Sequence, residues 1–457
     1  MKYFDVQITR VGGWSLKPRE FRTIAPAPRL FIPLAAHDDG STAAPKAPGT
    51  IVAAGEPITS EIGETLPAAL SPVAGIVRAA TTITLTCGRQ IPAVEVEATD
   101  TAAPEPDPIN MTQAEKALPE LENVHPADLF TWIDRIRHAG ITAHRKTSPD
   151  FLAQLHQSIK RPVDTILCNA LDEDGSARLN SVAAARWSPA MIVGLVLLAR
   201  LTGAKRNWII IEGESPGRWW RHLKRLAGKR VQLVSLRNDY PQPDPTLLLH
   251  TVVDRRLRPG RSPVEQGLLV LDPPTAAAIG ECAALERPML RVPIVLRDDR
   301  KGETHLLLVA VGTPLSHVLK ELAIPSSGVI VRAGHALRDI RVPADVILAG
   351  GELTLHIGHE EAPNIPEPCI RCSWCIEACP TQIQPAGLLE ASQRGDLALA
   401  DHYGLEACIE CGLCSHVCPS RLPLLEGIRR IKLRGEAVPQ AAEHVTPSSD
   451  APAISAT

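Results

Sequence analysis

The sequence predicts a multidomain protein that combines α/β and α+β units, and three observations support this fold class. The chain has 457 residues, which is more than one ordinary core accommodates. Its 41 prolines gather in clusters that separate stretches of different pattern. Eight of its 11 cysteines lie between positions 369 and 418. We therefore expect several consecutive domains, the last of them built around the cysteines.

The composition excludes some classes of partner. Hydrophobic residues make up 44%, charged residues 22%, and the formal net charge is -3, so no basic excess is available to hold nucleic acid. The longest apolar stretch, residues 191–201, is shorter than the roughly 20 residues that span a bilayer and predicts a buried helix. The first residues lack the pattern of an export signal. These features predict a cytoplasmic protein.

The first third of the chain predicts a small β-rich unit followed by a linker. Residues 21–98 contain short apolar runs separated by Gly and Pro, which favours short strands and tight turns. Residues 99–128 include Pro104, Pro106 and Pro108 and show no sustained periodicity. We expect an all-β domain and then an exposed linker.

The middle of the chain predicts an α/β layer. Within residues 129–297, buried-strand candidates at 208–211 and 231–234 alternate with helical segments. Such alternation is typical of a parallel sheet covered by helices. A charged turn follows this region, and we expect the domain to end there.

The last part of the chain predicts three further regions. Residues 298–358 contain a strand candidate at 305–311 and a helix candidate at 315–322, followed by short strands, which indicates a compact α+β module. Residues 359–433 hold the cysteine-rich domain. Residues 434–457 are rich in Ala, Pro and Ser and predict a disordered tail.

The cysteine-rich domain contains one spacing twice. Each copy is C-x2-C-x2-C-x3-C-P, the spacing of bacterial ferredoxins that bind two 4Fe-4S clusters. In that pattern, three thiolates of one run surround a cluster while the fourth reaches the other cluster. The spacing predicts one cluster on Cys369, Cys372, Cys375 and Cys418, and a second on Cys408, Cys411, Cys414 and Cys379.

Structural zinc and disulfides are the alternatives for these cysteines. Zinc sites usually show paired Cys-x2-Cys knuckles separated by a longer loop, whereas here four cysteines crowd each run. Disulfides are disfavoured in a chain that we expect to be cytoplasmic. Cys87, Cys168 and Cys282 stand alone in apolar surroundings, so we assign them no role.

The two cysteine runs, residues 369–379 and 408–420, resemble those of the RnfC family, a subunit of the Rnf ion-translocating oxidoreductase complex. Residues 29–34 and 71–77 are similar to that family's N-terminal barrel-sandwich hybrid, without a modifiable lysine at the expected hairpin. The resemblance implies that the cysteine domain transfers electrons.

The resemblance continues through the middle of the chain. Residues 239–241 and 259–270 resemble the flavoprotein-like α/β domain shared with the NADH-oxidising subunit of respiratory complex I. Residues 311–315 resemble the family's β-grasp, or SLBB-like, module. The implied fold is thus a barrel-sandwich hybrid, a flavoprotein-like α/β domain, a β-grasp module and a bacterial-type ferredoxin domain with two 4Fe-4S clusters.

The chain departs from this family at the nucleotide site. Members that oxidise NADH carry a glycine-rich loop that cradles FMN and nucleotide phosphates, whereas residues 139–149 here contain one glycine. The family's acidic turn corresponds to residues 168–174, which keep acids in another arrangement. One hypothesis is a modified nucleotide site that uses Asn169 or Glu173. The other, which we favour, is a solvated acidic loop on a degenerate scaffold, so that FMN and NADH are not expected to bind in the family's manner.

The resemblance implies a function in electron transport. We expect a peripheral subunit on the cytoplasmic side of the membrane, with membrane-embedded and peripheral subunits of an Rnf-like complex and an electron-carrier protein as partners. Electron transfer between clusters requires no catalytic acid or base. The alternative is a soluble iron-sulfur adaptor or scaffold that docks to and wires another oxidoreductase without oxidising NADH itself.

Overall fold

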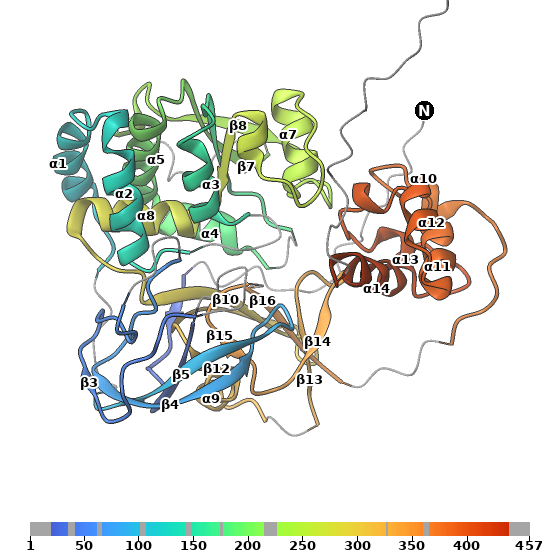
Figure 1. The fold of residues 1–457 in the computed structure, drawn as a ribbon, viewed down its shortest axis with the longest axis horizontal. Helices are drawn as coiled ribbons and strands as arrows, with labels where there is room; N and C mark the ends of the chain where they lie inside the picture. Colours follow the sequence, from blue (N-terminus) through green and yellow to red (C-terminus); the bar gives the residue numbers. More distant parts are fainter. Residues whose placement is uncertain are drawn as a thin grey trace, which may run out of the picture. The chain divides into compact units, whose positions relative to one another are not determined.

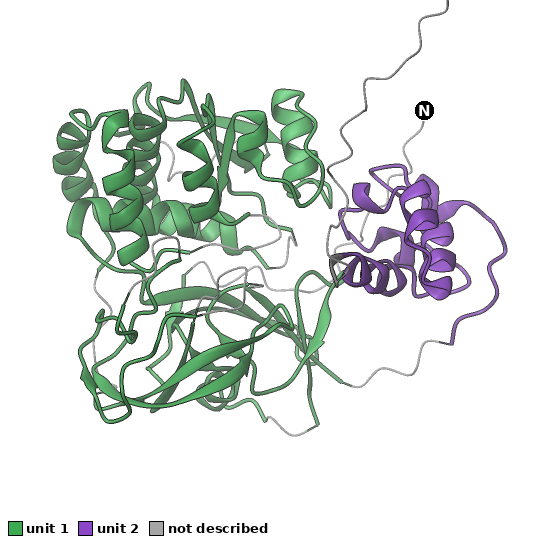
Figure 2. Ribbon diagram, in the orientation of Figure 1, with its two compact units in different colours: residues 1–362 green, residues 363–457 purple. Residues whose placement is uncertain are grey.

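The computed structural model divides the chain into two compact units, Met1–Ala362 and Pro363–Thr457 (Figure 1). Figure 2 colours the first unit green and the second purple. The structure describes residues 20–34, 42–61, 66–100, 107–142, 149–173, 177–213, 226–325, 328–351, 353–359 and 365–437.

The N-terminal region contains a four-stranded antiparallel sheet in the order β2-β5-β4-β3. Its strands are β2 Arg29–Pro33, β3 Ile51–Val52, β4 Gly75–Thr84 and β5 Gln90–Ala98. Side chains two positions apart, such as Leu30 and Ile32 or Val94 and Val96, point into one core. The predicted all-β character of this region is confirmed.

The expected linker contains a helix, so that prediction is wrong for α1, Met111–Leu121. Asn110 begins the helix with a capping box: its side chain accepts from the Gln113 backbone N–H, and the Gln113 side chain accepts from the Asn110 N–H. Ala114, Leu118 and Leu121 lie on one buried face, where they join the core of the α/β layer. This packing stabilises a helix that also contains a proline.

The α/β layer has a four-stranded sheet in the order β8-β7-β6-β9, and every neighbouring pair is parallel. The strands are β6 Thr165–Asn169, β7 Arg206–Glu212, β8 Gln232–Leu236 and β9 Leu268–Leu271. The helices with it are η1 Pro126–Asp128, α2 Leu129–His138, α3 Phe151–Ser158, α4 Leu179–Arg186, α5 Ser188–Thr202, α7 Pro245–Val253, η2 Pro263–Gln266 and α8 Pro273–Leu285. The predicted parallel α/β architecture is confirmed.

Helix α5 is the buried helix that the apolar stretch predicted. It crosses α8 so closely that a Cβ at Gly194 would lie 2.1 Å from the Ala276 carbonyl oxygen, and one at Gly280 would lie 1.8 Å from that of Ala190. Glycine is therefore required at both positions for the helices to approach. No single described helix is long and apolar enough to cross a bilayer; α4 and α5, bent by 89°, meet that criterion only when taken together.

A six-stranded mixed sheet follows, in the order β1-β11-β10-β16-β13-β14. Its strands are β1 Arg22–Thr23, β10 Arg291–Asp298, β11 Glu303–Ala310, β13 Ile330–Ala333, β14 Ile340–Val342 and β16 Thr354–Gly358. Strands β12 Thr313–Pro314 and β15 Ile347–Leu348 form a separate pair, and α9 spans Leu315–Glu321. The predicted α+β character is confirmed.

The charged turn that we expected to end the α/β domain lies inside this six-stranded sheet. Strands β10 and β11 pair antiparallel across it, and the Asp298 carboxylate accepts from the backbone and side chain of Arg300. The turn therefore joins two strands of one hairpin, because its charges are paired locally rather than left at a domain boundary. Strand β10, placed with the α/β layer from sequence, belongs to this sheet.

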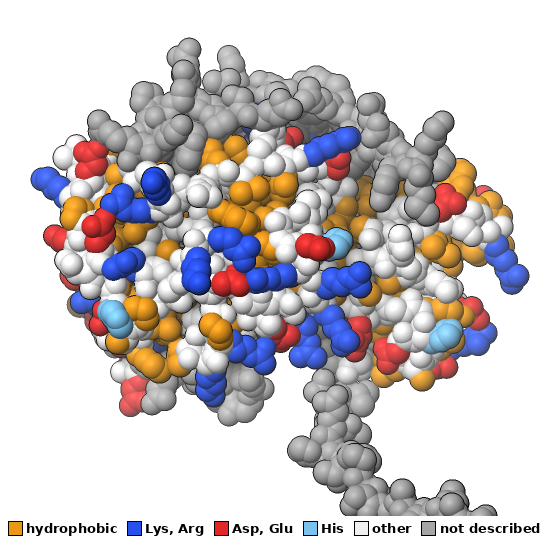
Figure 3. All heavy atoms as spheres, turned by 90° about the horizontal axis from the view of Figure 1, so that it is seen from above, with side chains coloured by type: hydrophobic (Ala, Val, Ile, Leu, Met, Phe, Trp, Pro, Cys, Tyr) orange, Lys and Arg blue, Asp and Glu red, His pale blue; other side chains and the backbone are white. Residues whose placement is uncertain are grey.

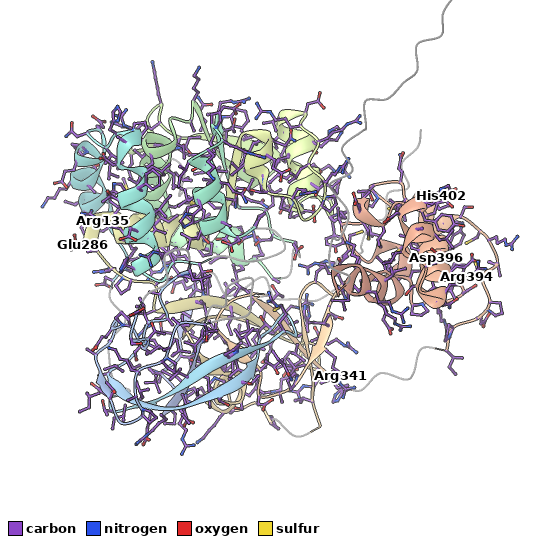
Figure 4. All side chains as sticks on the ribbon, viewed as in Figure 1. Arg135, Glu286, Arg341, Arg394, Asp396 and His402 are labelled. Atoms are coloured by element: carbon purple, nitrogen blue, oxygen red, sulfur yellow. The ribbon has the colours of Figure 1, made fainter. Side chains whose placement is uncertain are left out.

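The second unit is helical around the cysteines. Its helices are α10 Trp374–Glu377, α11 Pro385–Arg394, α12 Leu397–His402, η3 Leu405–Ala407, α13 Leu413–His416 and α14 Leu424–Ala437. Asp396, labelled in Figure 4, caps α12 by accepting from the Leu399 backbone N–H at 2.9 Å. Helix α14 extends to Ala437, so residues 434–437 are helical rather than part of a disordered tail, and the remainder of the predicted tail lies outside the described residues.

Candidate metal centre

The two cysteine runs follow the same backbone path. Arg371 and Ser373 in the first run have φ of 57° and 66°, and Glu410 and Gly412 at the matching positions of the second run have 54° and 81°. Left-handed residues that alternate with ordinary ones turn successive N–H groups toward one side of the chain, which forms a concave site for anions. The repeated spacing thus corresponds to a repeated local structure.

A short helix follows each of these loops. Helix α10 carries Cys375, and helix α13 carries Cys414 at the equivalent place. After each helix the fourth cysteine, Cys379 or Cys418, lies on a turn that leaves the helix axis. The fourth thiol of each run is therefore directed differently from the first three.

Cys379 lies with the cysteines of the other run. It lines one pocket with Cys408, Cys411 and Cys414, and the pocket wall also includes Ile428. All these thiols belong to the second unit, although Cys379 is 29 residues before Cys408 in the chain. The fold thus brings four cysteines of that pocket together from two separate runs.

The electrostatic neighbours of the thiols divide them in the same way. Burial raises the pKa of Cys414 to about 12, and the neighbouring thiols Cys411, Cys408 and Cys379 contribute to this increase. Burial also raises the pKa of Cys408. These shifts oppose formation of the thiolates that bind metal, so ionisation would depend on the charge of a bound group.

The pKa of Cys375, in the first run, is also raised. Burial is the main cause, and two thiols contribute: Cys372 of its own run and Cys418 of the other. The backbone N–H of Ala386 at the start of α11 lowers this pKa by hydrogen bonding to the sulfur. Cys369 and Cys372 are exposed.

Two cations from α14 lie beside the second run. Lys432 donates from Nζ to the Cys408 carbonyl oxygen at 2.7 Å and to Glu410 Oε1 at 2.9 Å. Arg429 Nε lies 3.3 Å from Glu410 Oε2, and the Glu410 backbone N–H donates to Cys408 Sγ at 3.4 Å. We did not predict Glu410, Arg429 or Lys432 from sequence. The only signal for the two cations was their spacing of three residues on one helical face.

The surroundings of the two runs differ in exposure. Ile370 in the first run is 68% exposed, whereas the matching Ile409 is 3% exposed. Trp374 is 52% exposed and the matching Leu413 is 8% exposed. The second run is enclosed by the chain, and the first lies at the surface of its unit.

The two alternatives for the cysteines find no matching arrangement in the part of the chain that the structure describes. Every cysteine there is a free thiol, and no group of three or more His, Cys, Asp or Glu is placed to hold a single metal ion. In a 4Fe-4S cluster each thiolate binds a different iron atom, so its four cysteines lie farther apart than the ligands of one ion. The grouping around the pocket fits a cluster better than a zinc ion.

The residues proposed for a modified nucleotide site are held within the chain. Asn169 donates from Nδ2 to the Pro243 carbonyl oxygen at 2.9 Å, and its Oδ1 accepts from the Leu171 N–H. Glu173 forms an ion pair with Arg338. Residues 143–148 of the expected nucleotide loop and Asp174 of the acidic turn lie outside the described residues.

The acidic turn is not a solvated loop, so the interpretation that we favoured is wrong on this point. Asp172 is buried and accepts from the backbone N–H groups of Asn180 and Ser181 at the start of α4. Burial raises the pKa of Asp172 to about 7, and the hydrogen bonds from Ser181 and Asn180 lower it in part. This carboxylate occupies a helix N-terminus, a position where an anion is otherwise stabilised.

Two family models define the class of protein. Residues 137–281 match the model of the Nuo51 FMN-binding domain, and residues 368–422 match that of the 4Fe-4S dicluster domain. The chain therefore contains an α/β domain related to the flavoprotein of complex I and a C-terminal 4Fe-4S dicluster domain, as the sequence predicted.

Curated relatives confirm the resemblance to the RnfC family. The chain is 26% identical over 418 residues to the C subunit of the ion-translocating oxidoreductase complex of Edwardsiella ictaluri, covering 88% of this chain and 50% of the relative. It is 24% identical over 209 residues to the C subunit of the Na⁺-translocating ferredoxin:NAD⁺ oxidoreductase complex of Acetobacterium woodii, covering 45% of this chain and 47% of the relative. The alignments thus span about half the length of these two relatives.

Among solved structures, an NAD⁺-reducing [NiFe]-hydrogenase in the H2-reduced state aligns with a TM-score of 0.49 at 13% sequence identity. The alignment covers 73% of this chain and 66% of the hydrogenase chain.

Proposed function

We propose that this chain transfers electrons through two 4Fe-4S clusters as a peripheral subunit of a membrane-bound ion-translocating oxidoreductase complex. The observation that carries the proposal is the presence of Cys379 in one pocket with Cys408, Cys411 and Cys414. Such exchange of the fourth cysteine between runs is the arrangement of two-cluster ferredoxins. The dicluster match and the relatives named as complex subunits support it.

The ligand sets follow from this arrangement. Cys408, Cys411, Cys414 and Cys379 would hold one cluster, and Cys369, Cys372, Cys375 and Cys418 the other. The proximity of Cys375 to Cys372 and Cys418 supports the second set. Bound clusters of this type accept and release single electrons.

The surrounding residues would control the properties of the site. Backbone N–H groups of Glu410 and Ala386 point at ligand sulfurs and stabilise negative charge there. Lys432 places a positive charge beside Cys408, which favours a more negative state of the nearby group. The burial of the second run excludes water from its pocket.

The remaining modules would support assembly. We assign residues 21–98 to a barrel-sandwich hybrid, 129–297 to the flavoprotein-like domain and 298–358 to an SLBB-like β-grasp module, with the cysteine domain at 359–433. The subunit would lie on the cytoplasmic side of the membrane. It would contact membrane-embedded and peripheral subunits of the complex and an electron-carrier protein.

The flavoprotein-like domain fits a donor other than NADH. FMN and dinucleotides bind at the carboxyl ends of parallel strands in such sheets. Here Asn169, Asp172 and Glu173 follow β6 at that edge, and their polar atoms already have partners within the chain. These side chains do not fit the group that the family name implies, so we infer that electrons enter from a protein.

A soluble adaptor is the second candidate. The same edge of the α/β layer is tied to the six-stranded sheet by the ion pair of Glu173 with Arg338 and by stacking of Tyr240 on His335 at 3.9 Å. A closed edge suits a domain retained for docking. Purification with membrane subunits would favour the complex, whereas purification with one soluble oxidoreductase would favour the adaptor.

The test is an anaerobic reconstitution of the full chain with iron and sulfide, followed by assays of iron, sulfide and flavin. We expect dithionite to bleach the visible iron-sulfur absorption and NADH to leave it unchanged. Cys379→Ser should remove about half of the iron, and Cys87→Ser is the matched control, because Cys87 lies in the first unit. Bleaching by NADH would contradict the protein-donor inference, and failure to take up iron would contradict the whole proposal.

A further inference from the structure

The amino ends of the α/β sheet carry a concentration of basic side chains. Because β8, β7, β6 and β9 are all parallel, the segments before these strands meet at one edge, opposite the edge that faces Arg338. Six exposed cations lie in the segments before β6, β7 and β9: Lys160, Arg161, Lys205, Arg256, Arg258 and Arg261. We call them the amino-edge patch.

Hydrogen bonds join the segments that carry the patch. The Asp164 carboxylate binds Arg206 at 2.8 Å and Arg255 at 2.7 Å, and its carbonyl oxygen accepts from the Lys205 N–H. Arg255 also donates to the Gln266 carbonyl oxygen. The patch is therefore one surface rather than three unrelated loops.

Few carboxylates offset these cations. Asp164 is already bound by two arginines, which hold its pKa well below the ordinary value for aspartate. Within residues 155–165, 203–206 and 254–268, the sequence has two other acids, Asp254 and Glu265. The whole chain has a net charge of -3, so this edge is opposite in sign to the average of the chain. Figure 3, which views the molecule from above, shows Lys and Arg side chains gathered on the face it presents.

The patch lacks the apolar centre of a protein-docking surface. The exposed large hydrophobic residues of the described chain are Ile51, Phe130, Ile365, Ile370, Trp374, Ile376 and Leu433, and none belongs to the three segments. Stable protein interfaces bury aromatic or aliphatic anchors at their centre. Lipid headgroups with phosphate need only cations that can reach a plane.

We propose that the amino-edge patch binds the headgroups of anionic lipids and so orients the α/β layer against a membrane surface. The attraction is electrostatic and acts within about 10 Å, so it should weaken with salt. The three cations before β6 and β7 lie in segments without Asp254, the exposed acid that follows α7. The proposal is independent of electron transfer, because no patch residue lies in the cysteine unit.

The test is sedimentation of the full, cluster-loaded chain with vesicles of equal parts phosphatidylglycerol and phosphatidylcholine, and with pure phosphatidylcholine. We expect binding only to the anionic vesicles, and its loss in high salt. The triple variant R161Q/R256Q/R261Q should bind at least about tenfold more weakly, because each cation near an anionic surface adds to affinity. All three side chains are exposed, so the fold should be unchanged by circular dichroism.

The matched control is R89Q/K301Q/K320Q, which removes the same charge from exposed positions outside the patch and should retain binding within about twofold. Equal loss in both triple variants would overturn the patch assignment, since net charge alone would then decide binding. Binding to pure phosphatidylcholine would also overturn it. Retention on immobilised polyglutamate without vesicle binding would show an acidic-protein surface instead of a lipid surface.

Discussion

The two cysteine runs share a spacing and a backbone path but differ in their surroundings. Before the second run, α12 and η3 place Ala400 and Leu405 in the same core as Cys408 and Cys414. Before the first run, residues 365–368 are exposed. A repeated motif thus repeats its local geometry, while burial depends on what precedes and covers each copy.

This difference separates two roles within one small unit. The enclosed second run contributes to the hydrophobic core, so its residues should control stability as well as cluster binding. The first run, with Ile370 and Trp374 at the surface, should affect cluster binding with less cost to the fold. Paired substitutions at matching positions test this division.

The largest effect is expected from the ligand cysteines. Cys414→Ser and Cys369→Ser should each lower bound iron by about half, because each removes one ligand of one cluster. Only Cys414→Ser should also destabilise the metal-free unit, by about 1 kcal/mol or more, because a hydroxyl would replace a buried thiol in the core. Iron assays and urea unfolding of the full chain measure the two effects. Equal destabilisation by both variants would contradict the comparison.

The next effect concerns the residue before the third cysteine of each run. Leu413→Ala should destabilise the unit by about 2–4 kcal/mol, because it leaves a cavity at a buried position. Trp374→Ala at the matching position should cost less than about 1 kcal/mol, because this side chain is half exposed. Thermal unfolding followed by circular dichroism gives both values, and a larger cost for Trp374 would show that its face is covered.

A smaller effect is expected from the left-handed positions. Gly412→Ala should cost about 1–2 kcal/mol, because φ of 81° disfavours a side chain. Ser373→Gly should stabilise the first run by up to about 1 kcal/mol, since its φ of 66° is already left-handed. Opposite signs in chemical denaturation support the shared backbone path. The same sign for both would mean that the runs differ in backbone as well as in burial.

The smallest effect concerns the cations of α14. Lys432→Met should make the reduction potential of one cluster more negative, on the order of tens of millivolts, and leave the other unchanged. Lys432→Arg is the control, because it keeps the charge beside the Cys408 carbonyl. Potentiometric titration followed by electron paramagnetic resonance distinguishes the two clusters. An equal shift of both would place Lys432 outside the environment of a single cluster.

Sequence patterns predicted the elements whose signal is local and repeated. The apolar run within β7 and the buried helix α5 were recognised because each is continuous and long enough to be distinctive. Helix α1 was missed because prolines obscured the capping box at Asn110. The β10–β11 hairpin was divided because its charged turn looked like a boundary, whereas Asp298 and Arg300 pair within it.

The sequence by itself determined the identity and spacing of the eight candidate ligands, because each run places four cysteines within 11 consecutive residues. The tertiary structure decided that Cys379 joins the pocket of the other run, that Lys432 lies beside Cys408, and that the two runs differ in burial. It also decided that Asp172 is buried at the start of α4. These features depend on contacts between segments distant in the chain, which local patterns do not encode.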